Sequence, residues 1–217
     1  MKSLFTCASF LGGLLGSPAF DIPKTTLDVQ PRLKLRRATK EDVSSTTDLI
    51  RAAYGYWVEN GVAVAPATQS AEKTRSHLLN GLGFVATDDT GSVRATVSLD
   101  NVNLVVGPSS AIAKAEHAKT EISYTATASE NQDIEGRYLE FKKLAVDPAI
   151  GRRGIGHALY MIAEDYARTH GYDGMILETV KEATWLYEWY RELGFKVYGS
   201  HVYGGSGLAT LLLIKRF

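Results

Sequence analysis

Hydrophobic residues in the first part of the chain recur with the period of a helix. Positions three or four apart face the same side from 43 to 57, which is the pattern of one buried face of an amphipathic helix. This face consists of Val43, Thr47, Ile50, Tyr54 and Trp57. Thr39 followed by Asp42 forms a capping box that predicts the start of the helix. We expect a strand over 33–38 before this helix and a second helix over 71–79 after it.

The rest of the pattern alternates short apolar strands with two more amphipathic helices. Runs with strand character cover 83–87, 93–99, 138–146, 174–179, 195–203 and 208–215. Helical patterns begin near Ile155 and Lys181, and each ends at a glycine, Gly171 or Gly194. The helix that follows the third of these strands lets it lie parallel to the fourth. The order β-α-α-β-β-β-α-β-α-β-β predicts an α/β fold, a mixed sheet with helices on its faces.

Alternation along the strand over 138–146 predicts which side chains share a face. In a regular strand, every second residue points to the same side of the sheet. One face is then expected to carry Glu140, Lys142, Leu144 and Val146, and the other Leu139, Phe141, Lys143 and Ala145.

Residues 102–136 interrupt the regular pattern. A loop is expected over 107–110, a short helix over 111–118 and a polar stretch over 129–136. Long irregular segments inside a compact domain are either functional lids or disordered. The sequence does not separate these two alternatives.

Composition places the chain among ordinary globular proteins. Its 217 residues are 45% hydrophobic and 22% charged, which suits one domain with a full core. Acidic and basic residues are equal at 24 each, so there is no global field to attract nucleic acid. The one cysteine, Cys7, lies in the leader, and the 5 histidines show no paired metal spacing. We therefore expect neither a disulfide nor a metal site.

The first 20 residues form a mostly apolar leader. Lys2 precedes the apolar run, and no acidic residue occurs before Asp21. This composition is typical of a weak secretory signal peptide, and a disordered extension or a misassigned start codon explains it equally well. Its glycines and its length argue against a stable membrane span. With a proline-containing linker over 22–31, the chain divides into a leader and linker (1–31) and a single domain (32–217).

The stretch LAVDPAIGRRGIGHAL (144–159) combines an apolar strand end, an Asp-Pro turn and a glycine- and arginine-rich bend before a helix. Backbone amides at a helix N-terminus attract anions, and glycines let a ligand approach those amides closely. The bend contains Gly151, Arg152, Arg153, Gly154 and Gly156. Its G-x-x-G-x-G spacing fits neither the dinucleotide fingerprint G-x-G-x-x-G nor a G-K-[ST] phosphate loop. The alternative is an ordinary strand-to-helix loop whose glycines serve tight packing.

Three stretches together resemble the GCN5-related N-acetyltransferase (GNAT) family: LRRATKEDV, LEFKKLAVDPAIGRRGIGHAL and LYEWYRELGF. The resemblance covers roughly 33–217 and implies a mixed sheet in which two parallel strands splay apart and hold acetyl-CoA as co-substrate. It further implies that main-chain groups of Leu144, Ala145 and Val146 contact the acetyl group and pantetheine. The amides of Arg152, Arg153, Gly154, Ile155 and Gly156 would take the pyrophosphate. Gly151 departs from the family, which usually has Gln or Arg at that position.

The resemblance also implies catalytic roles. Tyr190 aligns with the family's tyrosine, which can give a proton to the departing CoA sulfur; the alternative is packing, because Tyr190 belongs to the apolar face of its helix. Tyr187, one turn earlier, is the fallback. Glu140 is the candidate base for the amine proton, with an ion pair to Lys142 as the alternative. Glu178 on the next strand is a weaker candidate.

The expected function is an acetyl-CoA-dependent N-acetyltransferase that acts on a primary amine by direct attack in a ternary complex. A small-molecule amine is the first choice of acceptor, a peptide or protein amine the second, and a non-catalytic acyl-CoA sensor the competing function. Trp185 and Trp189 are expected in the periphery of the core, with a homodimer contact or a wall of the acceptor site as alternatives. Use of acetyl-CoA favours the cytoplasm, whereas the leader favours secretion.

Overall fold

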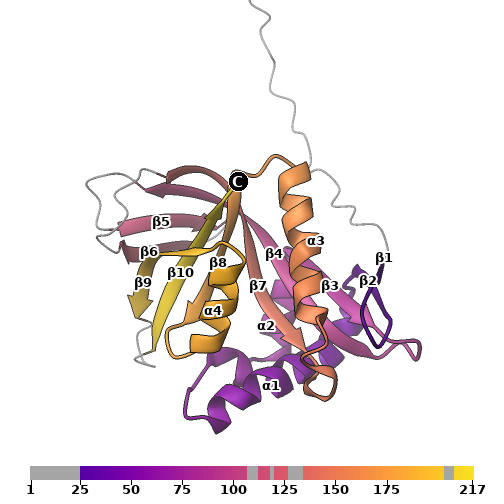
Figure 1. The fold of residues 1–217 in the computed structure, drawn as a ribbon. Coiled ribbons are helices and arrows are strands. Elements are labelled where there is room, and N and C mark those ends of the chain that lie inside the picture. Colours follow the sequence, from indigo (N-terminus) through magenta and orange to yellow (C-terminus); the bar gives the residue numbers. More distant parts are fainter. Residues whose placement is uncertain (1–24, 107–111, 118–119, 127–133, 203–207) are drawn as a thin grey trace, which may run out of the picture.

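The computed structural model describes residues 25–106, 112–117, 120–126, 134–202 and 208–217. The apolar leader, the loop expected over 107–110 and the glycine-rich turn before the last strand lie outside these residues. The described residues form a mixed sheet with helices on both faces, so the predicted α/β class is confirmed (Figure 1).

Ten strands and four α-helices lie within the described residues. The strands are β1 (Thr25–Leu27), β2 (Leu33–Arg37), β3 (Leu82–Thr87), β4 (Val93–Val106), β5 (Ile112–His117), β6 (Thr120–Ala126), β7 (Ile134–Val146), β8 (Gly174–Val180), β9 (Lys196–Val202) and β10 (Ala209–Arg216). The helices are α1 (Val43–Glu59), α2 (Ala71–Arg75), α3 (Ile155–Thr169) and α4 (Thr184–Glu192). Each strand and helix expected outside 102–136 has a counterpart, with boundaries shifted by a few residues.

The predicted capping box fixes the start of the first helical segment. The Thr39 amide donates a hydrogen bond of 2.8 Å to Asp42 Oδ2, and Arg36 on β2 donates to both carboxylate oxygens of Asp42 at 2.6 and 2.8 Å. Burial alone would raise the pKa of Asp42, but the hydrogen bonds from Arg36 and Thr39 lower it. A 3-10 turn therefore leads into α1, and the ionised Asp42 carboxylate in this turn is held against the sheet by Arg36.

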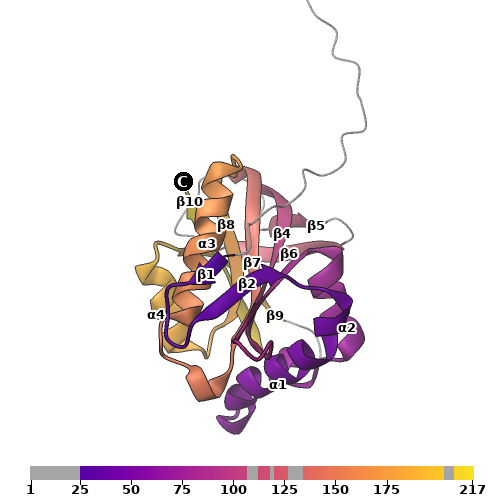
Figure 2. The same ribbon diagram turned by 90° about the vertical axis from the view of Figure 1, so that its right-hand side faces the viewer.

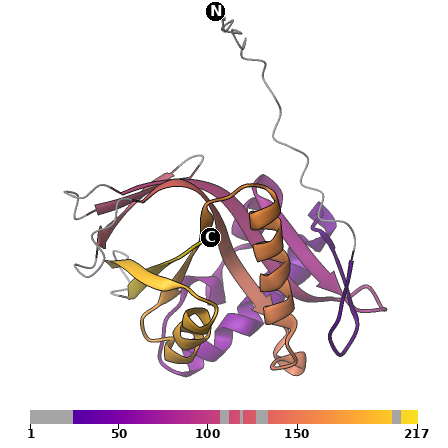
Figure 3. The same ribbon diagram turned by 45° about the horizontal axis from the view of Figure 1, so that its top comes forward.

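The sheet curls so far that part of it closes on itself. Its order is β1-β2-β3-β4-β5-β6-β9-β10-β8-β7, and β4 also pairs with β7. The strands β4, β5, β6, β9, β10, β8 and β7 thus form a closed ring, whose curvature is visible in Figure 3. Only β7 and β8 pair in parallel, and all other pairings between described strands are antiparallel. These two strands are joined by α3, so the predicted strand-helix-strand unit is present and accounts for their parallel direction.

The helices cover the sheet unequally. α3 and α4 lie on one side and share the largest core cluster with Phe141, Leu177 and Phe195. α1 and α2 lie on the other side (Figure 2). A separate cluster fills the ring, in which Tyr138 and Tyr198 pack among aliphatic residues of β4, β8 and β10. The site described below lies where these layers meet.

The short helix expected over 111–118 is wrong. This segment is strand β5, which pairs with β4 through Leu104 and Ala115 and with β6 through Ala115 and Ile122. Alanines give the segment a local preference for helix, but hydrogen bonds to a strand on each side decide its conformation. The hairpin of β5 and β6 then reaches β9 through Thr125 and Ser200 and completes the ring.

The stretch expected as a linker also contains a strand. β1 pairs antiparallel with β2, and Leu27 is only 2% exposed. Leu27 packs in the main core cluster beside Leu33 and Leu35. The packed part of the chain therefore begins before the domain boundary that the prolines suggested.

A buried charge network fastens α3 to β10. Glu164 accepts hydrogen bonds from Lys215 at 2.7 Å, from Arg168 at 2.7 and 3.0 Å, and from the hydroxyl of Tyr160. Burial alone would raise the pKa of Glu164, but these donors lower it to about 2. All the charged groups of this network have partners, which is the condition under which buried charges stabilise a fold.

We expect Glu164→Gln to lower the free energy of unfolding by about 2 kcal/mol at pH 7, because Lys215 loses its charged partner in a buried place. The pKa of Glu164 is lower in the folded than in the unfolded state, so its stabilisation is present above pH 4.5 and is lost as the pH falls toward 2. Urea unfolding at pH 7 and pH 3 measures the difference. The exposed Glu192→Gln is the control; an equal loss at both pH values would contradict the role of charge.

Candidate active site

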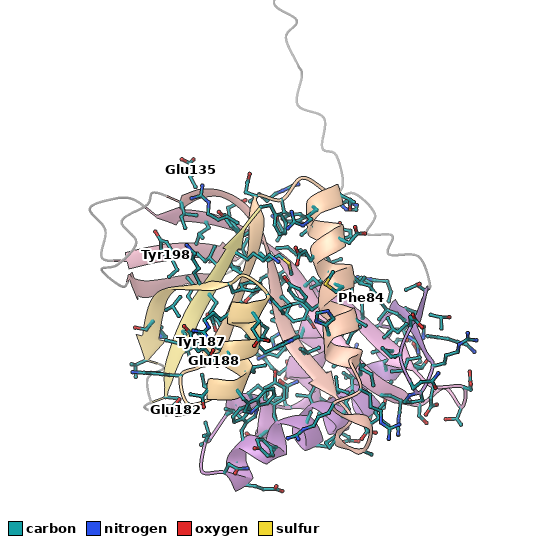
Figure 4. All side chains as sticks on the ribbon, viewed as in Figure 1. Phe84, Glu135, Glu182, Tyr187, Glu188 and Tyr198 are labelled. Carbon is teal, nitrogen blue, oxygen red and sulfur yellow. The ribbon has the colours of Figure 1, made fainter. Side chains whose placement is uncertain are left out.

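The parallel strands β7 and β8 separate halfway along their length. They pair at only three positions, from Tyr138 with Gly174 to Glu140 with Ile176. Beyond that point β7 continues along β4 to Val146, and β8 continues along β10. β7 runs from Glu135 at one end of the molecule toward the end that carries α4 and Tyr187 (Figure 4). The edges of β7 and β8 that face each other therefore have no partner among the described strands after Glu140.

A bulge in β7 changes the direction of its side chains inside this unpaired stretch. Ser98 pairs with Lys142 and Thr96 with Ala145, so two residues of β7 oppose one residue of β4. Lys143, the first residue of the bulge, has φ +53°, in the left-handed region. The predicted alternation is consequently wrong beyond Lys142.

After the bulge, Leu144 and Val146 face the same side as Phe141 rather than the side of Glu140. Both pack against the main cluster that contains the buried face of α3. Ala145 instead packs against Leu49 and Ile50 of α1. The three residues with expected ligand contacts thus divide between the two faces of β7.

The loop after β7 is built from a proline turn and two left-handed residues. Asp147 accepts a hydrogen bond of 2.8 Å from the Ala149 amide and forms an ion pair of 2.9 Å with Arg94 of β4. Arg152 has φ +59° and Gly154 has φ +78°. These conformations turn the chain sharply into α3, for which Gly154 is the N-cap.

The N-terminus of α3 offers unpaired backbone donors next to β7. The first bond of the helix runs from the Ala158 amide to the Gly154 carbonyl at 2.9 Å, so the amides of 155–157 have no acceptor within the helix. A Cβ at Gly154 would meet no atom within 4 Å, and one at Gly156 would lie 3.5 Å from Leu144. The structure thus brings the loop amides and β7 together, as the sequence predicts, with open space above Gly154.

Gly151, the departure from the family pattern, has ordinary backbone angles. Its φ is −60° and its ψ is 166°, which any residue adopts. A Cβ there would approach the Pro148 carbonyl oxygen at 3.5 Å, an ordinary contact. The loop conformation therefore does not require glycine at this position. Arg152 and Arg153 are exposed and have no ion pair among the described residues.

Tyr190 lies deep beside the separated strands. It is 5% exposed, and its ring meets Phe195 edge-on with 5.9 Å between the ring centroids. Burial, and then the neighbouring Tyr54, raises the pKa of Tyr190 above its usual value. Burial also raises the pKa of Tyr54 to about 12, and Tyr54 packs against the cluster around Ala145. Both hydroxyls therefore stay protonated at neutral pH.

Tyr54 is a residue whose place beside Tyr190 was missed. Its spacing put it on the buried face of α1, but spacing within one helix does not reveal which other helix lies opposite. Tyr187, the fallback for Tyr190, is half-buried on α4 and packs at the edge of the main cluster.

Glu140 occupies the last paired position of β7 and is 7% exposed. Its carboxylate lies 3.0 Å from Lys142 Nζ, and Lys142 also bonds to Asp100 on β4. The ion pair that the sequence offered as an alternative is therefore present. Burial lowers the pKa of Lys142, but Glu140 and Asp100 together raise it above the usual value. Glu178 lies on β8 two residues beyond Ile176, the partner of Glu140.

Lys143 and His77 also lie near Glu140, and a role was predicted for neither residue. Burial, opposed in part by Glu140, lowers the pKa of Lys143 to about 8. Burial and then the charge of Lys143 lower the pKa of His77 to about 3, so His77 is neutral at physiological pH. The sequence feature that could have indicated a role for Lys143 is the pair of adjacent lysines, Lys142 and Lys143, in a strand otherwise rich in apolar residues.

Two tryptophans join α1 to α4 at the end where β7 and β8 have separated. The rings of Trp57 and Trp185 stack with centroids 5.6 Å apart and planes 6° apart. Trp185 is nevertheless 58% exposed, so its expected place in the periphery of the core is wrong. Trp189 does lie there, half-buried against Tyr160 and Tyr190. Trp185 instead forms, with Trp57, an exposed aromatic bridge between the two helices.

The described part of the chain contains no group of three or more His, Cys, Asp and Glu residues arranged to hold a metal ion. None of its helices has both the length and the apolar character needed to cross a membrane.

Comparison with solved structures finds the same fold in several acetyltransferases. A GNAT acetyltransferase from Streptococcus agalactiae gives a TM-score of 0.61 at 16% identity, covering 88% of this chain and 98% of that one. The ribosomal-protein-S18-alanine N-acetyltransferase from Escherichia coli gives 0.55 at 15% identity, covering 85% and 93%. PaiA N-acetyltransferase from Thermoplasma acidophilum, solved with coenzyme A, gives 0.53 at 16% identity, covering 85% and 99%.

These structures share the fold with this chain, and no curated protein matches its sequence. The model of the family described as "Acetyltransferase (GNAT) family" matches residues 56–195, which is more than half of the chain. That match includes the separated strands, the loop before α3 and Tyr190. The chain therefore belongs to the GNAT family of acetyltransferases.

Proposed function

We propose that the protein transfers an acetyl group from acetyl-CoA to the primary amine of a small molecule, by direct attack in a ternary complex. The observation that carries this proposal is the unpaired edge of β7, which begins at Glu140 and leads to the unpaired amides at the start of α3. Buried main-chain groups need hydrogen-bond partners, and an extended ligand laid along this edge supplies them. A coenzyme A solved with a neighbour of the same fold supports this choice of ligand.

The loop before α3 fits a pyrophosphate. The amides of 155–157 and the positive end of the helix dipole attract an anion, and the exposed side chains of Arg152 and Arg153 add charge. The space above Gly154 allows close approach to these amides. A Cβ at Gly156 would lie 3.5 Å from the side chain of Leu144. The loop therefore directly adjoins β7, along which the pantetheine would lie.

The chemistry requires a polarised carbonyl, a base and an acid, and acetyl-CoA supplies the reactive thioester. An N–H of Leu144 or Val146, on the edge of β7 that faces away from β4, donates a hydrogen bond to the carbonyl oxygen as negative charge develops on it. Glu140 takes the proton of the attacking amine, and Lys142 beside it favours the ionised carboxylate. Tyr190, which stays protonated because burial raises its pKa, gives a proton to the departing sulfur.

Two alternatives remain distinct from this proposal. A peptide or protein amine is the second acceptor class, and the E. coli neighbour is named for an alanine of a ribosomal protein. The equal numbers of acidic and basic residues give no global field that would favour a charged peptide or protein, so the small molecule is the first choice. A non-catalytic sensor would bind acetyl-CoA at the same loop but would need neither Glu140 nor Tyr190.

We expect Gly156→Asp to weaken acetyl-CoA binding by about tenfold or more, because the carboxylate places negative charge beside the phosphate position. Gly156→Asn has nearly the same volume without the charge, and its Cβ meets Leu144 and Val146 at ordinary contact distances. It should therefore lose much less affinity. Calorimetric titration of acetyl-CoA measures both. Equal affinities for Asp, Asn and wild type would remove the loop from the proposed binding site.

We expect Tyr190→Phe and Glu140→Gln each to lower kcat by about 10²-fold with acetyl-CoA affinity largely kept, because each removes a proton-transferring group. Release of free thiol with a panel of primary amines measures kcat, and titration of acetyl-CoA measures binding. Tyr187→Phe on the same helix is the matched control and should retain wild-type turnover. A wild-type protein that binds acetyl-CoA but acetylates no amine would support the sensor instead.

A further inference from the structure

Two polar groups beside Glu140 have no bonded partner. His77 Nε2 is buried and makes no hydrogen bond within the described residues. Lys143 is half-buried, and its ammonium forms no hydrogen bond or ion pair within that part of the chain. The charge of Lys143 acts on His77, and the charge of Glu140 acts on both groups. Buried polar atoms are almost always hydrogen-bonded, so the unpaired His77 Nε2 beside a half-buried lysine points to a missing ligand.

The charges around these groups do not balance. The neighbours that interact with Lys143 and His77 include the ammonium groups of Lys73 and Lys142 and the carboxylate of Glu140, and Asp100 joins the cluster through Lys142. Three lysines and two carboxylates leave a net charge of +1, because His77 is neutral. Lys142 bonds directly to both carboxylates, so the remaining positive charge resides on half-buried Lys143 and on exposed Lys73.

The backbone of Lys143 is also in an unfavourable conformation. Its φ of +53° costs a residue with a side chain about 1 kcal/mol or more relative to a right-handed conformation. Partial burial of its side chain, without a bonded partner among the described residues, adds to that cost. A lysine at this place therefore costs stability, and a bound anion would offset part of that cost.

We infer that Lys143 and His77 bind the carboxylate of the acceptor, so that the acceptors of this enzyme are amines that also carry a carboxylate. This inference rests on the proposed function, since it places the acceptor's amine at Glu140 and its carboxylate at Lys143. A carboxylate carries a single negative charge that matches the single positive charge of Lys143, whereas a phosphate dianion would exceed it. His77 adds a neutral donor when the proton is on Nε2.

The position of Lys143 suits this role. It is three residues after Glu140 on β7, and the bulge places it where β7 and β8 no longer pair. One strand thus carries both the base for the amine and the cation for the carboxylate. An acceptor without the carboxylate would leave Lys143 and His77 unpaired when it binds, and sites with polar groups left unpaired discriminate strongly against such analogues.

The test compares acceptors that differ only in the carboxylate: phenylalanine with phenethylamine, leucine with isoamylamine, and ornithine with putrescine. Thiol release at saturating acetyl-CoA gives kcat and KM for wild type, Lys143→Met, Lys143→Arg and His77→Phe. Lys181→Met, at an exposed position, is the control. We expect wild type to favour the carboxylate member by tenfold or more in kcat/KM, mainly through KM.

Lys143→Met should abolish this preference while leaving kcat/KM for the simple amine within about threefold, and Lys143→Arg should restore most of it. A second readout is independent of turnover: calorimetry with N-acetylphenylalanine and N-acetylphenethylamine in the presence of CoA should show the same preference in binding. Thermal melting checks that each variant folds, and His77→Phe replaces Lys143→Met if the latter does not.

Three results would overturn the inference. Wild type could acetylate both members of a pair equally, Lys143→Met could lose activity equally on both, or the two N-acetyl products could bind equally. Each of these leaves the acetyltransferase proposal intact. Absence of turnover with every amine, while acetyl-CoA still binds, would overturn the proposed function and this inference with it.

Discussion

The early end of the hydrogen-bond ladder between β7 and β8 is the constraint on which the rest of the structure depends. A parallel pair that stops at Glu140 and Ile176 leaves main-chain donors and acceptors without partners in the middle of a sheet. Such a gap is tolerable only where something else binds the exposed groups. The bulge at Lys143, the loop into α3, and the tyrosines of α1 and α4 all border this one gap.

The two charge clusters of the protein differ in a way that separates stability from function. Around Glu164, every charged group has a bonded partner, and the cluster fastens a helix to a strand. Around Glu140, Lys142 is bonded twice while Lys143 and His77 have no bonded partner among the described residues. Glu164 and Glu140 are both buried, so burial of the carboxylate alone does not distinguish the two clusters. The distinction is whether the protein supplies all the partners itself.

The sequence predicted the features that depend on local chemistry. The capping box at Thr39, the glycines around Arg152, and the helix between β7 and β8 were all recognisable because neighbouring residues determine them. Features that depend on distant partners were not predictable. β5 is a strand because β4 and β6 lie beside it, and the bulge at Lys143 arises from a register against β4 that alternation within β7 cannot reveal. The place of Tyr54 beside Tyr190 was not predictable for the same reason, because the two residues lie on different helices.

The closed ring of strands has a consequence for how the enzyme would respond to ligands. Because the hairpin of β5 and β6 links β4 to β9, and β10 links β9 to β8, the ring holds β7 against β4 and β8 against β10 along the edges that face away from the gap. The ring of strands therefore fixes the distance between β7 and β8, and ligand binding would require little backbone reorganisation. Differences in affinity among ligands would then come from side-chain contacts, and exchange of the residues lining the gap should alter selectivity without altering the frame.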